Sequence, residues 1–105
     1  MIILNRSQII EKLKSIDITA LIEAGFIAYT EGKAVVPPPG ELRFQNPPGD
    51  VHIKYGYLKE DEYYVVKIAS GFYKNSLLNL PSSNGLMLVF SQKTGELLAI
   101  LLDEG

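Results

Sequence analysis

Four residues of this sequence carry side chains that can bind a small polar ligand or act on it: Arg43, His52, Lys67 and Ser82. Lys67 stands in the apolar stretch of residues 65–69, and a cation placed there calls for an anion close by. Arg43 can hold a carboxylate through two parallel hydrogen bonds, and His52 can serve as an acid or base at neutral pH. Ser82 belongs to a polar stretch that can line a cofactor pocket. The residue types therefore point to a site for a small carboxylate.

The same four residues also have simple structural explanations. Lys67 can lie on an edge strand with its ammonium group in solvent, and Arg43 can be an ordinary surface charge. Ser82 can be part of a turn, and His52 can be a residue on the polar face of a strand. From the residue types alone these explanations are the commoner ones. The sequence also contains no nucleophile elbow, P-loop or G-x-G-x-x-G loop.

Composition excludes several functional classes. With 105 residues and a net charge of −2, the chain is expected to form one domain and to bind no nucleic acid. It has no cysteine and a single histidine, so no metal site is expected. Charges come too early for a signal peptide, and no apolar run reaches the ~18 residues that span a membrane. We therefore expect a cytoplasmic protein without a membrane partner.

The first third of the chain has the pattern of two helices. Asn5 and Ser7 can each cap the first helix, and Gln8 follows Asn5 by three residues, in the position of a capping box. Asp17 begins the second, in which apolar residues recur every three or four positions up to Gly32, a natural helix end. Gly25 on this stripe costs about 1 kcal/mol of helix propensity relative to alanine, so we expect a close packing partner for it.

Strand patterns follow the second helix. The predicted strands are residues 34–36, 41–44, 51–57, 63–69, 85–90 and 97–102. Alternation in the third of them places Val51, Ile53, Tyr55 and Tyr57 on one face and His52 and Lys54 on the other. The turn at residues 59–62 predicts a hairpin, and Gly95 in the last turn stands where a positive φ is wanted.

The last two predicted strands are apolar at every position, which predicts burial on both faces. Two helices can cover only one face of such a sheet. We therefore predict an α+β fold, a two-layer sandwich in which the N-terminal helices pack on a mainly antiparallel sheet. The other face of the sheet is expected to meet a second subunit or a further domain.

A series of motifs runs through the whole chain and is densest over residues 66–105. It comprises Phe26, Tyr29 and Gly32, the proline-rich stretch before Arg43, the predicted strand that carries Lys67, Asn75, Leu80-Pro81, Thr94-Gly95 and Leu102-Asp103-x-Gly105. In this order and approximate spacing, the sequence resembles the N-terminal part of the ornithine cyclodeaminase and mu-crystallin family. Members of that family are NAD(P)-dependent and include ornithine cyclodeaminase, archaeal-type alanine dehydrogenase, reductases of cyclic ketimines and mu-crystallin.

The resemblance implies a role for each candidate residue. Arg43 and Lys67 would hold the substrate carboxylate, and Lys67 would also assist proton transfer as the catalytic lysine. Ser82 falls where a serine or threonine lines the nicotinamide side of the cofactor. His52, a further substrate-binding candidate, lies near a glutamate of the cyclodeaminase, and Lys54 replaces a methionine often seen in the family. These departures argue against specificity for ornithine.

The family also has parts that these residues do not include. Its members continue with an R-T-A-A segment and a Rossmann domain, which binds NAD or NADP and carries an aspartate that works on the substrate amine. The resemblance thus implies that residues 1–105 form a single domain that binds a small amino or imino acid and forms a homodimer through the apolar sheet face. Alone, the chain is expected to be catalytically inactive and to hold no dinucleotide tightly. The alternative is a stand-alone, non-catalytic domain that dimerises or binds a small carboxylate.

Overall fold

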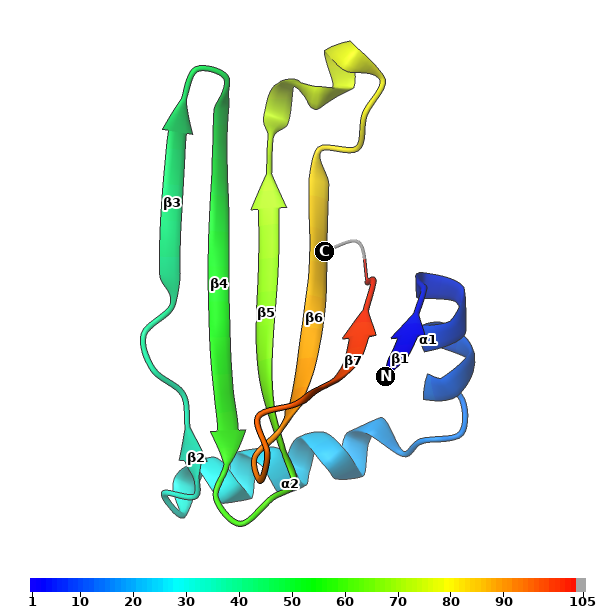
Figure 1. Cartoon of the computed structure of the whole chain (residues 1–105), viewed down its shortest axis with the longest axis vertical. Helices are drawn as coiled ribbons and strands as arrows, with labels where there is room; N and C mark the ends of the chain where they lie inside the picture. Colours follow the sequence, from blue (N-terminus) through cyan, green and yellow to red (C-terminus); the bar gives the residue numbers. More distant parts are fainter. Residues whose placement is uncertain (104–105) are drawn as a thin grey trace.

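The computed structural model describes residues 1–103, and it shows one seven-stranded sheet with helices at its margins (Figure 1). The strands are β1 (Ile2–Leu4), β2 (Ala34–Val35), β3 (Gly40–Gln45), β4 (Pro48–Leu58), β5 (Tyr63–Gly71), β6 (Ser83–Ser91) and β7 (Leu97–Leu101). The helices are α1 (Arg6–Leu13), α2 (Ile18–Thr30) and the 3₁₀ helix η1 (Tyr73–Leu78). Gly105 of the predicted motif series lies outside the described residues.

The strands follow the order β1-β7-β6-β5-β4-β2, and β3 pairs with β4 beside β2. Each described pairing is antiparallel except that of β1 with β7, which is parallel. The predicted α+β sandwich with a mainly antiparallel sheet is thereby confirmed. No helix within residues 1–103 is long and apolar enough to cross a membrane.

Both helices begin where the sequence predicts. The Asn5 side chain accepts a hydrogen bond from the backbone N–H of Gln8, and the Gln8 side chain accepts one from the backbone N–H of Asn5, each at 2.9 Å. Asp17 accepts a hydrogen bond from the backbone N–H of Ala20 at 3.1 Å and so caps α2. Gly32 follows α2 with φ of +74°. α2 lies across one end of the sheet, the end at which β2 is found (Figure 1).

The predicted hairpins are also present. In β4 and β5, Tyr57 lies opposite Tyr64 on either side of the turn. Gln92 fixes this turn, because its side-chain amide donates to the carbonyl oxygens of Leu58 at 2.9 Å and Tyr63 at 2.8 Å. In the turn between β6 and β7, Gly95 has the predicted positive φ, +74°.

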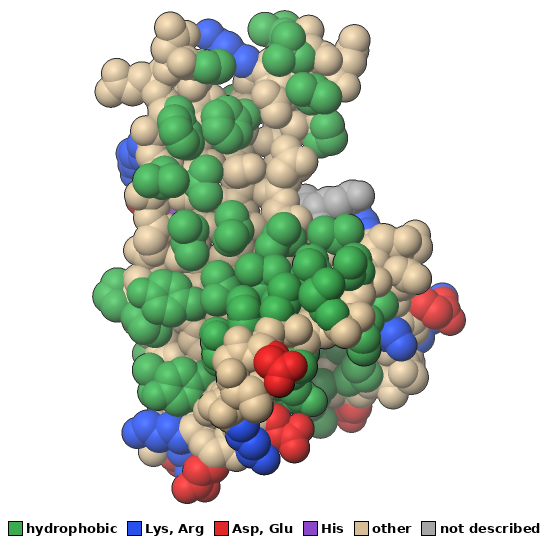
Figure 2. All heavy atoms as spheres, in the orientation of Figure 1, with side chains coloured by type: hydrophobic (Ala, Val, Ile, Leu, Met, Phe, Trp, Pro, Cys, Tyr) green, Lys and Arg blue, Asp and Glu red, His purple; other side chains and the backbone are tan. Residues whose placement is uncertain are grey.

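The two faces of the sheet differ in chemistry. Alternate residues of the paired strands form an apolar face, whose members include Val51, Ile53, Tyr55, Tyr57, Tyr64, Val66, Ile68, Leu86, Leu88, Phe90 and Ile100. Figure 2 shows hydrophobic side chains gathered across the lower half of this face. The opposite face, here called the polar face, carries the charged residues of β3, β4 and β5, and α2 lies on its side of the sheet (Figure 1).

This arrangement encloses no hydrophobic core. None of the hydrophobic side chains within residues 1–103 is fully buried. The accessible surface is 7927 Å², whereas a compact monomer of this mass exposes about 5,800 Å². The radius of gyration is 15.9 Å, against about 13 Å for a compact domain of this length. The fold therefore exposes on the order of 2,000 Å² more surface than a compact monomer of this mass.

Two elements and one contact differ from the prediction. The sequence did not predict β1 or η1, because each is short. β1 forms only by pairing with the distant strand β7. The prediction of a close packing partner for Gly25 is not met within residues 1–103, because no atom lies within 4 Å of the position that a Cβ would occupy.

Candidate functional site

The sheet register places three of the predicted site residues, Arg43, His52 and Lys67, on the polar face in three successive rows. The first row contains Arg43, Asp50, Gly71 and Ser83, and the second contains Glu41, His52, Ala69 and Gly85. The third row contains Lys54, Lys67, Met87 and Leu101. The small residues Ala69 and Gly85 leave the middle row open, with polar groups in the row on each side.

Lys67 lies near the middle of β5 and is partly exposed. Its Nζ is 3.6 Å from Oδ2 of Asp103, which follows β7. The anion that the structure places beside this cation is thus a carboxylate of the chain itself. Lys54 lies directly opposite Lys67 on β4, so two ammonium groups leave the same face at neighbouring positions.

Arg43 shares the polar face with Lys67 but does not contact it. From strand spacing and rise, their Cα atoms are roughly 16 Å apart, because two strand steps and four residues separate them. The Arg43 side chain is 80% exposed, and its Nε lies 2.6 Å from Oε1 of Glu41. Arg43 and Lys67, the two residues predicted to bind the carboxylate, can therefore reach one carboxylate only if the Arg43 side chain turns toward the middle row.

A second polar cluster surrounds Asp50 in the first row. Asp50 accepts a hydrogen bond at 3.1 Å from the hydroxyl group of Tyr73 in η1, and its Oδ2 is 3.8 Å from Nε2 of His52. This hydrogen bond, with the charge of Asp50, raises the pKa of Tyr73 above its ordinary value of 10.0, and the nearby Arg43 opposes the shift. His52 thus lies between the Asp50 cluster and the lysine row.

Ser82 lies immediately before β6, at the Arg43 end of the sheet. Its backbone carbonyl accepts a hydrogen bond from Phe72 N–H at 2.8 Å. The Asn75 side chain donates to the carbonyl oxygen of Pro81 at 2.9 Å and so fixes the segment that leads to Ser82. A hollow of about 430 Å³ is lined there by Arg6, Pro81, Ser82, Ser83 and Asn84. These hydroxyl and amide groups can contact one polar edge of a ligand.

Four residues of the site were not among the predicted ones: Asp50, Lys54, Tyr73 and Asp103. Asp103 and Tyr73 reach the site through non-local pairings, which a sequence pattern does not reveal. For Lys54 a signal did exist, because a hairpin centred on the turn at residues 59–62 pairs residues that are equally distant from that centre. This symmetry brings Lys54 opposite Lys67.

The polar face can therefore bind a small carboxylate and hold a proton donor beside it. Lysine ammonium groups donate charge-assisted hydrogen bonds to carboxylates, and such bonds are about twice as strong as neutral ones. No group of three or more potential metal ligands lies close together in the part of the chain that the structure describes.

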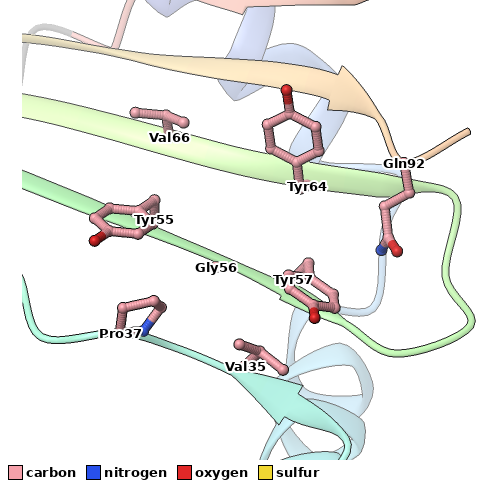
Figure 3. Close-up of a pocket in the computed structure, with 8 residues that line it drawn as sticks. All are labelled: Val35, Pro37, Tyr55, Gly56, Tyr57, Tyr64, Val66 and Gln92. Carbon is pink, nitrogen blue, oxygen red and sulfur yellow. The ribbon is translucent and has the colours of Figure 1, made fainter. Parts of the chain in front are cut away.

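On the other side of the sheet, the apolar face has a hollow of about 410 Å³ (Figure 3). It is lined by Val35, Pro37, Tyr55, Gly56, Tyr57, Tyr64, Val66 and Gln92. The Tyr64 ring stacks on Phe90 with ring centroids 4.8 Å apart and an interplanar angle of 2°. Such an open aromatic surface is typical of a protein–protein contact.

Sequence comparison identifies relatives of this chain. The profile of the ornithine cyclodeaminase/mu-crystallin family matches residues 1–103. A Rhizobium meliloti protein provisionally named a dehydrogenase is 36% identical over 86 residues, which are 82% of this chain. A Sinorhizobium fredii protein named an uncharacterized cyclodeaminase is 37% identical over 92 residues, which are 86% of this chain. The chain spans 26% and 28% of the length of these relatives.

Solved structures share the fold. The Thermococcus litoralis Δ1-pyrroline-2-carboxylate reductase, in complex with NADH and L-proline, is 30% identical with a TM-score of 0.79. An archaeal alanine dehydrogenase dimer with bound NAD is 28% identical with a TM-score of 0.75. These alignments cover 97% and 99% of this chain but only 32% and 31% of the two enzymes.

Proposed function

This chain belongs to the ornithine cyclodeaminase/mu-crystallin family, and on that premise we propose that it is the substrate-binding and dimerisation part of an NAD(P)-dependent enzyme. The substrate would be an amino acid or a cyclic imino acid. The whole enzyme would move hydride between the nicotinamide and a carbon–nitrogen centre next to a carboxylate.

The observation that carries the proposal is the polar face itself. Lys67 would bind the substrate carboxylate and assist proton transfer, while Asp103 holds its ammonium group in place at 3.6 Å. Arg43 would complete the carboxylate site by leaving Glu41 and turning toward the middle row. His52 would contact the remainder of the substrate, since it lies between Arg43 and Lys67 on this face.

The residues present do not suffice to hold the dinucleotide. Ser82 and its neighbours offer polar groups to one edge of a nicotinamide, but the 105 residues contain no glycine-rich loop for the pyrophosphate. We propose that residues 1–105 are a single domain and that a separate Rossmann domain of the parent enzyme binds NAD or NADP. The relatives, about four times as long as the aligned segment, support this division.

The apolar face would form a homodimer. The excess surface of about 2,000 Å² exceeds the ~800 Å² that each partner buries in a standard interface. The apolar-face residues are uncharged, so a second copy can cover them without burying an unpaired charge. That the similar archaeal alanine dehydrogenase is a dimer supports this arrangement.

The same exposed surface favours a second candidate function, a stand-alone domain that dimerises or binds a small carboxylate without catalysis. It differs from the first in a measurable way. A stand-alone dimer would associate with increasing concentration whether or not amino or imino acids are added.

The test is a titration of the purified 105-residue chain with L-proline, followed by nuclear magnetic resonance. We expect binding that is weakened about tenfold or more in Lys67→Ala and Arg43→Ala, because each variant removes a charge-assisted hydrogen bond. Lys93→Ala, in the turn after β6, is the control and should bind as the wild type does. We also expect no NADH oxidation by the chain with Δ1-pyrroline-2-carboxylate. Turnover by the chain alone, or unchanged binding in Lys67→Ala, would overturn the proposal.

A further inference from the structure

Lys54 and Lys67 occupy directly opposite positions on the antiparallel strands β4 and β5. Their Cα atoms are therefore about 4.5–5.5 Å apart, and both side chains leave the sheet on the polar face. Like charges placed directly opposite each other destabilise a sheet. A cross-strand lysine pair of this kind calls for negative charge beside both ammonium groups.

Asp103 supplies only part of that negative charge. Its carboxylate pairs with Lys67, whereas Lys54 makes no ion pair or hydrogen bond within residues 1–103. Glu41 and Asp61 are the other carboxylates of this region, and neither pairs with a lysine of the pair. Glu41, opposite His52 on β3, pairs with Arg43 at 2.6 Å. The Asp61 Oδ1 accepts the backbone N–H of Glu62 at 2.7 Å in the turn. Among the described residues, one carboxylate thus stands against two ammonium groups, which leaves one positive charge for a further anion to balance.

Both lysines line a hollow of about 480 Å³ that runs from them toward the β4–β5 turn. Apart from Asp61, the other lining residues are apolar, aromatic or glycine: Ala34, Val36, Tyr55, Gly56, Tyr57, Leu58, Tyr63, Val65 and Val89. Gly56 lets β2 pass close to β4 at the edge of the hollow, because a Cβ at Gly56 would lie 2.8 Å from the carbonyl oxygen of Val35. The hollow thus has two ammonium groups at one end and mainly apolar side chains along the rest of its lining.

We propose that Lys54 is a second carboxylate-binding residue that acts together with Lys67, and that the hollow selects an amino or imino acid with an apolar body. This inference rests on the proposed function and specifies its substrate class. The carboxylate lies between the two ammonium groups, where it supplies the missing charge. The apolar body enters the hollow, where each buried methylene group adds to the affinity.

The experiment is the titration of the 105-residue chain with L-proline, carried out on Lys54→Met and Lys54→Arg. We expect Lys54→Met to weaken binding about tenfold or more, and Lys54→Arg to stay within about threefold of the wild type, because arginine keeps the charge. Lys93→Met is the matched control, since it removes a lysine far from the hollow. Circular dichroism confirms that each variant is folded.

Two further ligands separate a binding role from a structural one. Prolinamide lacks the carboxylate, so its binding should be the same in the wild type and in Lys54→Met. Glycine lacks the ring, so it should bind about tenfold more weakly than L-proline. Equal effects of Lys54→Met on L-proline and prolinamide would show a structural role and overturn the inference.

The variants also distinguish this inference from the proposed function. If Lys67→Met no longer binds L-proline and Lys54→Met binds it as the wild type does, the carboxylate-binding role of Lys54 is refuted and the proposed function stands. If the wild-type chain binds neither L-proline nor Δ1-pyrroline-2-carboxylate, the proposed function fails and the inference fails with it.

Discussion

The carboxylate of Asp103 lies 3.6 Å from the ammonium group of Lys67, so the segment after β7 is tied to the middle of β5. β6 lies between these two strands, and the ion pair therefore reaches across it on the polar face. Asp103 occupies part of the space around Lys67 that an incoming carboxylate would use. The pair thus holds the lysine in position and also competes with the ligand for it.

Asp103→Asn should separate these two effects. Both side chains of the pair are partly exposed, so we expect the free energy of unfolding to change by less than about 1 kcal/mol. Removing the competing carboxylate should strengthen L-proline binding about threefold, measured by titration. Glu11→Gln, which removes the exposed pair with Lys14, is the control and should leave binding unchanged. Weaker binding in Asp103→Asn would mean that positioning of Lys67 outweighs competition.

The hydrogen bond between Tyr73 and Asp50 should be visible in a pH titration. Because the pKa of Tyr73 is raised in the folded chain, its neutral form is favoured there, and this stabilisation is fully present below the ordinary value of 10.0. It is lost as pH rises through the higher pKa of the folded state. We expect one tyrosine to ionise later than the others in ultraviolet absorbance, and Asp50→Asn to abolish the delay. A delayed tyrosine that persists in Asp50→Asn would contradict the assignment.

Local chemistry made much of the fold predictable from the sequence. The helix caps at Asn5 and Asp17 and the turn at Gly95 depend on neighbours within a few residues. The residue types at these positions therefore predict them. The alternation of β4 likewise assigned His52 and Lys54 to one face, and the register confirms it. The two-faced sheet follows from these elements.

Long-range pairing set the limit of prediction. β1 is only three residues long and exists because Ile3 lies opposite Ile100 on β7, at the other end of the chain. The contact of Lys67 with Asp103 depends on the same distant strand. Arg43 and Lys67 were expected to grip one carboxylate, yet only the register shows that four residues and two strand steps separate them.

Gly25 offers a test of what covers α2. Nothing lies within 4 Å of the position of an added Cβ, so Gly25→Ala should raise the free energy of unfolding by about 0.5–1 kcal/mol through helix propensity. Ala24→Gly, one residue away on the same helix, should lower it by a similar amount. The measurement is urea denaturation at several protein concentrations. A destabilising Gly25→Ala would show that another chain packs closely on this stripe.

Charge on the apolar face should prevent association. Leu88 lies on β6 within this face, and Leu88→Glu would place an unpaired carboxylate in the middle of a two-copy contact. We expect the wild-type chain to sediment as a dimer at micromolar concentration and Leu88→Glu to weaken the association at least a hundredfold, since an unpaired buried charge costs about 3 kcal/mol or more. Leu77→Glu is the matched control, because Leu77 in η1 is 79% exposed and lies off both faces. If Leu77→Glu disrupts the dimer and Leu88→Glu does not, the two copies meet through η1 and the apolar face has another occupant.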